Sequence, residues 1–319
     1  TKVGVLRGGP SSEYDVSLKT GGSVLKNIPE EKYDIRDIFI SKDGEWHLRG
    51  IPFAPEKIIS QVDVVFNAMH GEYGEDGTVQ QLLDTFSIPY TGSTAFASAI
   101  GMNKLLTKQG IEDYGIDTPE YTIIESSEDI ERDIFDIFRS FPQPCVIKPV
   151  VGGSSVGVTI ARSFDELRDG VYKAFGNSPR VLIEEYIYGR EATCGVVERF
   201  RGEEFHALMP VEIIPPAKSG FFDYNAKYGG CTKEICPANF ESVIKEEIQR
   251  LALEAHKVLG LRHYSRSDFI ISPRGIYFLE TNTLPGLTQE SLMPKALEAG
   301  GTKLSEFLDH LVELALGNK

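Results

Sequence analysis

Cysteine is scarce in this sequence. The 319 residues include four cysteines, and no two of them form a C-x-x-C pair. They are Cys145, Cys194, Cys231 and Cys236. A disulfide framework or a thiolate metal site normally uses characteristic, closer spacings. We therefore expect reduced thiols in a cytoplasmic protein, and a metal site or a disulfide is the less favoured interpretation.

Long hydrophobic runs are also missing. The longest apolar runs are as long as a strand, well short of the roughly 20 residues that a membrane helix needs. The apolar run at residues 3–6 is too short for the core of a signal peptide, so we expect it to form a first strand. These features predict a cytoplasmic protein without a membrane partner.

Basic residues are few relative to acidic ones. Lys and Arg total 33 against 47 Asp and Glu, which gives a net charge of −14 and an isoelectric point near 5.0. Binding nucleic acid requires a basic surface, so this charge argues against a nucleic-acid partner. A small anionic ligand is still compatible with it, provided that a few Lys and Arg side chains converge locally.

Two common phosphate-binding motifs are absent. No G-x-G-x-x-G occurs, and Gly8-Gly9 is followed by proline, which argues against a dinucleotide-binding oxidoreductase. The segment KPVVGGSSVGV (148–158) lacks the Gly-Lys-Ser/Thr of a Walker A motif. A Gly/Ser hairpin can nevertheless lay backbone N–H groups over phosphates, and Lys148 and Lys104 would add positive charge. For this segment alone, an ordinary turn is the alternative.

The length and the order of the expected elements indicate an α/β (α+β mixed) protein of three domains. The apolar run at 63–69 is followed by a Gly-rich loop and an expected helix at 78–86, which is typical of a parallel sheet. We place an N-terminal parallel α/β domain at 1–92, a central domain at 93–180 and a C-terminal domain at 181–319.

The segment RSDFIISPRGIYFLETN (266–282) is predicted to form a hairpin with polar side chains on one face. With an odd number of loop residues, Asp268 would lie opposite Glu280. Arg266 would then lie opposite Asn282, whereas a two-residue loop would scatter these side chains over both faces. Carboxylates and an amide oxygen gathered in this way suit Mg²⁺. A salt bridge of Arg266 with the acids is the alternative.

Two further segments suggest a nucleotide site. In VLIEEYIYGREAT (181–193), the acids Glu184, Glu185 and Glu191 follow an apolar run and would suit adenine and ribose, although a solvated pair of acids is the alternative. The 23-residue stretch from Pro215 to Pro237 is long for an ordinary loop and is interpreted as a lid. Its expected hinges are Gly220, Gly229 and Gly230.

Together these segments resemble the ATP-grasp family and, within it, the D-alanine–D-alanine ligases. The resemblance covers essentially the whole chain and implies a three-domain ATP-grasp fold. It also implies that ATP drives the joining of two D-alanine molecules through an acyl phosphate, for peptidoglycan precursor synthesis. Six segments carry it: GGPSSEYDVS (8–17), AMHGEYGEDGTVQ (68–80), KPVVGGSSVG (148–157), DYNAKY (223–228), RSD (266–268) and ETNTLPGLTQESLMP (280–294).

The resemblance implies a metal and nucleotide site. Asp268, Glu280 and Asn282 would hold two Mg²⁺ ions, with Mn²⁺ as an alternative metal. The residues implied to contact ATP are Lys104, Lys148, Ser154, Ser155, Glu184, Glu185, Ile187, Glu191 and Lys227.

It also implies two amino-acid sites. Glu13 would receive the ammonium group of the first D-alanine and would be linked to Ser154 and Tyr228 of two closing loops, with His70 nearby. Arg266 and the backbone N–H of Gly286 would polarise the acyl phosphate and the tetrahedral intermediate. The carboxylate of the second D-alanine would meet Ser291 and Leu292.

The sequence departs from the family pattern at two positions. Ser265 stands where the family usually has glycine, and Asn225 stands where a glutamate is common. The retained Lys227 and Tyr228 favour D-alanine as second substrate over D-lactate or D-serine. Another ATP-grasp carboxylate–amine ligase stays an alternative, and a non-catalytic nucleotide sensor would be expected to lack the metal ligands. From the family we expect a homodimer.

Overall fold

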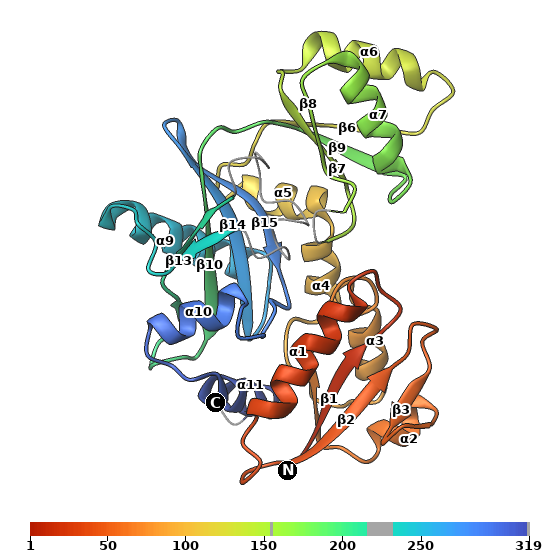
Figure 1. Ribbon diagram of the computed structural model, residues 1–319, viewed down its shortest axis with the longest axis vertical. Helices are drawn as coiled ribbons and strands as arrows, with labels where there is room; N and C mark the ends of the chain where they lie inside the picture. Colours follow the sequence, from red (N-terminus) through yellow and green to blue (C-terminus); the bar gives the residue numbers. More distant parts are fainter. Residues whose placement is uncertain (154–155, 216–231, 318–319) are drawn as a thin grey trace.

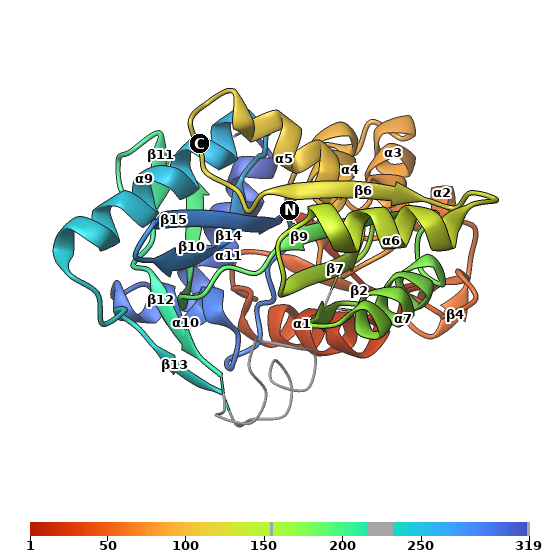
Figure 2. The same ribbon diagram turned by 90° about the horizontal axis from the view of Figure 1, so that it is seen from above.

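The computed structural model describes residues 1–153, 156–215 and 232–317, and these form three β-sheets with flanking helices (Figure 1). In that view the first sheet lies at the lower right, the second at the top and the third at the left. Figure 2 shows the same arrangement from above, with α6 and α7 on the outer side of the second sheet.

The first sheet is built by the N-terminal part of the chain. Its elements are β1 (Lys2–Gly8), α1 (Tyr14–Asn27), β2 (Asp34–Ile40), β3 (Trp46–Leu48), β4 (Ile51–Pro52), α2 (Pro55–Ile59), β5 (Val64–Asn67) and α3 (Thr78–Thr85). The order is β4-β3-β2-β1-β5, and β1 pairs in parallel with both β2 and β5. The parallel sheet expected from the alternation of strands and helices is therefore present in β2-β1-β5, and β3 and β4 extend it as antiparallel strands.

The second sheet lies in the middle of the chain and has a core of its own. Its strands follow the order β6-β9-β7-β8, with antiparallel neighbours. Two helices pack on it and bury side chains such as Ile134 and Leu167. The elements are β6 (Tyr121–Glu125), α6 (Ile130–Ser140), β7 (Cys145–Pro149), β8 (Thr159–Ala161), α7 (Phe164–Phe175) and β9 (Arg180–Glu185).

The third sheet follows the order β13-β12-β10-β14-β15, with β11 paired to β10. Its strands are β10 (Arg190–Glu198), β11 (Phe205–Ala207), β12 (Val211–Ile214), β13 (Lys233–Ile235), β14 (Tyr264–Ser272) and β15 (Gly275–Asn282). The helices that follow in this region are α9 (Ser242–Val258), α10 (Leu292–Ala299) and α11 (Leu304–Ala315). In the described part of the chain, no helix is long and apolar enough to cross a membrane.

One hydrophobic core joins the first and third units. Val3 and Phe66 of the first sheet share it with Phe307 and Leu311 of the last helix, and all four are fully buried. The Tyr33 hydroxyl adds a polar contact, because it donates to Asp309 Oδ1 at 2.5 Å. These two units therefore pack as one body, whereas the second sheet keeps a separate core.

Two segments differ from the predicted division of the chain. Helices α4 (Ala95–Met102) and α5 (Lys104–Glu112) were expected in the central unit, but Ala97 and Ile111 pack into the core of the third sheet. Leu105 of α5 packs against the second sheet, so α5 contacts both. Strand β9 was expected to open the C-terminal unit, but it pairs with β6 and β7 of the second sheet. Sequence pattern gives the element, while its partner sheet depends on tertiary packing.

The β14–β15 hairpin has the expected pairing at the site but not the expected turn. Asp268 lies opposite Glu280, and Arg266 lies opposite Asn282. Ser272 pairs with Gly275, so the loop has two residues rather than an odd number. The predicted loop was therefore wrong. A β-bulge between Asp268 and Phe269, where the partner strand carries Leu279 as an extra residue, restores the register that a two-residue loop would lose.

Candidate active site

A cavity of about 490 Å³ opens between the second and third sheets. Apolar side chains line both of its walls, and lysines and acids lie around them, which suits a flat base with charged groups attached. The apolar residues are Val146, Val158, Ile160, Ile214, Phe269, Ile270 and Leu279. The predicted nucleotide and metal residues that line it are Lys104, Lys148, Glu184, Glu185, Ile187, Glu191, Asp268 and Glu280.

Lys104 connects the Gly-rich segment to the third sheet. It is the first residue of α5, directly after Asn103, whose side chain accepts the Leu106 N–H and caps the helix. Lys104 Nζ donates to the Gly152 carbonyl at 2.7 Å and lies 3.4 Å from Glu280 Oε2. Its ammonium group therefore stands between the predicted phosphate loop and a predicted metal ligand.

A buried carboxylate at the wall of the cavity holds two lysines. Glu184 Oε2 contacts Lys148 Nζ, and Glu184 Oε1 lies 2.9 Å from Lys108 Nζ. Burial would raise the pKa of Glu184, but the two lysines outweigh it and lower that pKa. Burial likewise opposes the charge of Lys148, yet Glu184 and Glu280 raise its pKa. For Lys108 burial is the larger influence and lowers the pKa. We take all three groups as charged, because both cations touch the carboxylate.

The other predicted nucleotide residues also reach the cavity. Ile187 is nearly buried, and Glu191 lies on β10 between β12 and β14. The Glu185 carboxylate forms an ion pair with Arg274 at 2.6 Å, at the tip of the β14–β15 hairpin. This contact ties the second sheet to the third across the cavity.

The predicted metal ligands lie on one face of the hairpin. Arg266 donates to both oxygens of Asp268 at 3.0 Å, and Thr193 Oγ1 donates to Asp268 Oδ1 at 2.5 Å. The salt bridge considered as an alternative is therefore present. It leaves acceptor capacity on the Asp268 carboxylate, which lines the cavity together with Glu280. With the amide oxygen of Asn282, these hard oxygen donors fit Mg²⁺.

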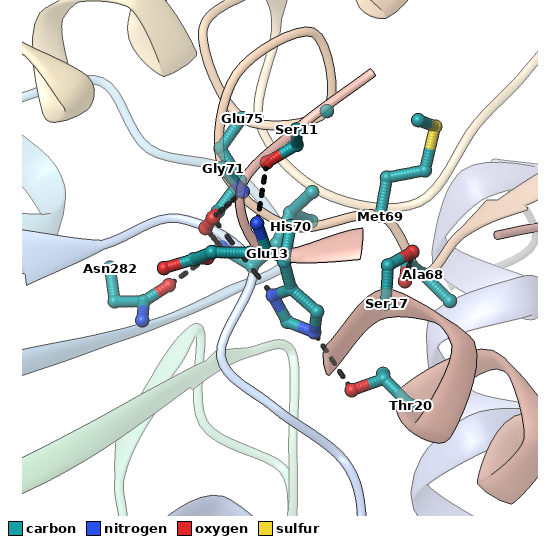
Figure 3. Close-up of polar contacts among 12 residues, drawn as sticks. Ser11, Glu13, Ser17, Thr20, Ala68, Met69, His70, Gly71, Glu75 and Asn282 are labelled. Atoms are coloured by element: carbon teal, nitrogen blue, oxygen red, sulfur yellow. Dashed lines mark hydrogen bonds and ion pairs between the residues drawn. The ribbon is translucent and has the colours of Figure 1, made fainter. Parts of the chain in front are cut away.

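A second, buried polar cluster lies at the start of α1 (Figure 3). Glu13, His70 and Glu75 are all at least nine-tenths buried, and one ligand atom from each lies within 4.8 Å of the others. His70 Nε2 is hydrogen-bonded to Thr20 Oγ1 at 2.8 Å, and the Glu13 N–H donates to Ser11 Oγ at 3.0 Å. The structure thus brings the two predicted first-substrate residues together.

Glu75 links this cluster to the metal ligands. Its carboxylate accepts the Gly71 N–H at 2.6 Å and the Leu284 N–H at 3.3 Å. The same Leu284 N–H also donates to Asn282 Oδ1 at 3.3 Å. Burial, together with the negative charge of Glu13, raises the pKa of Glu75 to about 8. Burial and Arg266 lower the pKa of His70 to about 4, so its imidazole is neutral at neutral pH.

The predicted second-substrate residues lie beside the loop that follows β15. Ser291 is the N-cap of α10, and its Oγ accepts the Thr288 N–H at 3.2 Å. A methyl group at Gly286 would lie 2.9 Å from Ser291 Oγ, so this loop passes closely over the serine. Leu292, the first residue of α10, is buried in the joint core, so its side chain is structural.

Several predicted residues lie outside the described part of the chain. They include most of the stretch interpreted as a lid, and they are Ser154, Ser155, Gly220, Asn225, Lys227, Tyr228, Gly229 and Gly230. The described end of the Gly-rich segment does reach the first-substrate cluster. A methyl group at Gly153 would lie 3.3 Å from Glu13 Oε1.

Sequence reasoning missed Glu75 and Lys108. Glu75 stands in the loop that yielded His70, and Lys108 follows Lys104 by four residues, which places both lysines on one face of α5. These spacings were visible signals. What the sequence did not reveal is that the Glu75 and Lys108 side chains are almost fully buried.

Comparison with known proteins decides the family. The model described as "D-ala D-ala ligase N-terminus" matches residues 2–58 and 49–93, and "D-ala D-ala ligase C-terminus" matches 111–313. The chain belongs to the D-alanine–D-alanine ligase family. It is 39% identical to the D-alanine–D-alanine ligase of Syntrophobacter fumaroxidans, over 98% of this chain and 97% of that protein. It is 36% identical to the ligase of Clostridium beijerinckii, over 99% and 98%.

Solved structures of the ligase family share the fold. The VanG D-Ala:D-Ser ligase from Enterococcus faecalis matches with a TM-score of 0.85 and 32% identity, over 99% of both chains. The D-alanine–D-alanine ligase from Bacillus anthracis complexed with ATP matches with a TM-score of 0.82 and 32% identity, over 99% of this chain and 98% of that one. The ATP-grasp fold expected from the sequence is thereby confirmed.

Proposed function

We infer that this protein joins two D-alanine molecules to D-alanyl-D-alanine, converting ATP to ADP and phosphate, for peptidoglycan synthesis. The observation that carries this inference is the continuity between the cavity and the Glu13 cluster. Gly153 lies against Glu13, and the Leu284 N–H joins Glu75 to Asn282. An amino acid bound at the Glu13 cluster would therefore place its own carboxylate beside the terminal phosphate of a nucleotide in the cavity.

The first step activates a carboxylate, which is a poor electrophile. Its oxygen attacks the terminal phosphorus of ATP, and an acyl phosphate forms while ADP leaves. Such a transfer depends on positioning and on neutralising charge rather than on a protein nucleophile. Lys104 and Lys148 supply positive charge at the cavity. Mg²⁺ held by Asp268, Glu280 and Asn282 would neutralise phosphate charge when bound.

The second step forms the peptide bond. The amine of the second D-alanine attacks the acyl carbon, phosphate leaves and the amine loses a proton. We assign Glu13 to the ammonium group of the first D-alanine. Arg266 and the Gly286 N–H would stabilise negative charge on the acyl oxygen. Ser291 would hold the second carboxylate. Burial of the Glu13 cluster supports this assignment, because an acyl phosphate must be kept from water.

D-serine as second substrate is the alternative that a specific observation favours. The VanG neighbour is a D-Ala:D-Ser ligase with the same fold. The curated relatives, at 34–39% identity, are named D-alanine–D-alanine ligases, which supports D-alanine as the main substrate.

The test is phosphate release from ATP and Mg²⁺ with D-alanine, compared with L-alanine and with D-alanine plus D-serine or D-lactate, with products identified by mass. We expect D-alanine alone to suffice and D-alanyl-D-alanine to form. Phosphate release that requires D-serine would show that D-serine is the second substrate. No phosphate release in any mixture would refute the proposed reaction. The Mg²⁺ ions, the homodimer and the cytoplasmic location stay predictions.

A further inference from the structure

Lys108 is a fully buried cation that the reaction described above does not use. Its side chain is 0% exposed, and it does not line the cavity, whose wall carries Glu184 and Lys148. Its ammonium group donates to the Pro119 carbonyl at 3.2 Å and lies 5.1 Å from the centre of the Tyr121 ring. Burying an ammonium group is costly unless a charge compensates it. The compensating charge is Glu184.

Glu184 also depends on Lys108. The carboxylate is 2% exposed, and Lys148 contacts its Oε2 atom. Within the described residues, Oε1 accepts no hydrogen bond of good geometry. Lys108, 2.9 Å away, therefore compensates this oxygen by Coulomb attraction rather than by an aligned hydrogen bond.

The charge of the three groups decides what the cavity presents to an anion. Lys108, Glu184 and Lys148 together carry a net charge of +1. Without Lys108, the remaining pair would be neutral, and the carboxylate would cancel the lysine at the cavity wall. Such cancellation is strong here, because a buried pair is poorly screened by solvent.

We propose that Lys108 is a positioning residue for nucleotide binding: it neutralises Glu184 from behind, so that Lys148 presents a full positive charge to the phosphates. This inference rests on the proposed nucleotide site. It assigns Lys108 a much larger effect on the polyphosphate than on the base, because the cation lies outside the cavity and can reach the base only through Glu184. A residue that only supported the fold would weaken both.

The experiment compares the dissociation constants of ATP and adenosine, each with Mg²⁺ present. Lys108→Met keeps the length of the apolar stem and removes the charge. We expect it to weaken ATP binding about tenfold, or about 1.4 kcal/mol, and to change adenosine binding less than about twofold. Lys57→Met is the matched control, because it removes the same charge from an exposed position on α2. That control should leave both constants unchanged.

Restoring the charge balance distinguishes this role from a structural one. The double variant K108M/E184Q again carries +1, so its ratio of adenosine to ATP dissociation constants should return toward that of the wild type. Glu184→Gln alone removes the carboxylate that opposes Lys148, whether or not Lys108 keeps its proton without that partner, so the ratio should not fall below that of the wild type. A fall would contradict the proposal even if Lys108→Met does not fold.

Three further results would count against the proposal. The proposal would be overturned if the ratio of adenosine to ATP dissociation constants did not fall in Lys108→Met. It would also be overturned if that ratio were no higher in K108M/E184Q than in Lys108→Met. If the wild type bound ATP no tighter than adenosine, the nucleotide site itself would be refuted, and the role of Lys108 with it.

Discussion

At the scale of single residues, the site depends on charges that are compensated by neighbouring opposite charges. Glu184 is held by two lysines, Asp268 by Arg266, and Glu280 lies next to Lys104. Removing one member of such a pair leaves the other uncompensated. The effect of a substitution therefore depends on the remaining partner as much as on the residue changed.

Glu280→Gln should abolish turnover while the fold is kept. The carboxylate is one-third exposed, so its loss should lower the free energy of unfolding only slightly. The substitution does remove a predicted metal ligand and the charged partner of Lys104. We expect kcat to fall by more than about 100-fold, measured by phosphate release. Glu246→Gln, an exposed position on α9, is the control. Near wild-type turnover in the Glu280 variant would remove the metal assignment.

The raised pKa of Glu75 predicts a pH-dependent difference in stability. The folded protein holds its proton up to about pH 8, while the unfolded chain loses it near 4.5. The stabilisation from that proton is therefore complete below about pH 4.5 and is lost as the pH rises through 8. Glu75→Gln cannot ionise. Relative to wild type, its free energy of unfolding should rise by at least about 2 kcal/mol between pH 5 and 8.5.

Urea unfolding of both proteins at the two pH values measures this difference. His70, whose pKa is lowered to about 4, destabilises the fold as the pH falls, but it does so in both proteins and largely cancels. A difference that does not change with pH would show that Glu75 is ionised in the folded state.

At the scale of elements, the hairpin shows how far sequence reasoning reaches. Alternation along the strands predicted that Asp268 and Glu280 would face each other, because a side-chain period of two leaves little choice once both must share a face. The same reasoning gave the wrong turn, because an extra residue at Leu279 has no signature in the pattern. Periodicity therefore predicts which residues pair across the hairpin, but it does not predict whether the turn length or a β-bulge produces that pairing.

Single-residue deletions in β15 test the bulge. Deleting Leu279 removes the extra residue and should leave Asp268 opposite Glu280. Deleting Thr281 should turn Asn282 to the other face. We therefore expect phosphate release at least about tenfold slower in the Thr281 deletion than in the Leu279 deletion. Equal loss in both would mean that the bulge does not set the register.

Ser265 shows how a departure from the family pattern is accommodated. Its hydroxyl is fully buried and lies 2.7 Å from His256 Nδ1 on α9. Ser265→Gly, the family's usual residue, should lower the free energy of unfolding by about 1–2 kcal/mol, because the buried imidazole nitrogen loses its partner. The turnover of the folded variant should stay close to wild type. Chemical denaturation measures the change in the free energy of unfolding. A large drop in kcat would contradict the expected turnover.

At the scale of the whole molecule, the three sheets do not correspond to three independent cores. The first and third share one core. Of the predicted central unit, α4 packs with the third sheet and α5 packs between the second and the third. The sequence indicated where strands and helices lie, but which core a helix completes is decided by contacts between distant segments. Glu75 and Lys108 were missed for the same reason, since their burial arises from that packing.

Trp46, the only tryptophan, is buried in a core on the other face of the first sheet, so its fluorescence reports the unfolding of that sheet, against which the shared core packs. Leu311→Ala in α11 and Leu167→Ala in α7 are matched truncations of fully buried leucines in different cores. We expect Leu311→Ala to lower the stability followed by Trp46 fluorescence by about 3 kcal/mol. Leu167→Ala should leave that transition nearly unchanged. Equal effects would show that all three units unfold together.

The position of α11 in the shared core also has a consequence for synthesis. Val3 of β1 shares its core with α11, a helix that begins at Leu304. At a translation rate of about 5–20 residues per second, the two are made roughly 15–60 s apart. During that interval the first sheet has an open apolar face. The nascent chain must therefore keep this face from associating with other chains until α11 leaves the ribosome.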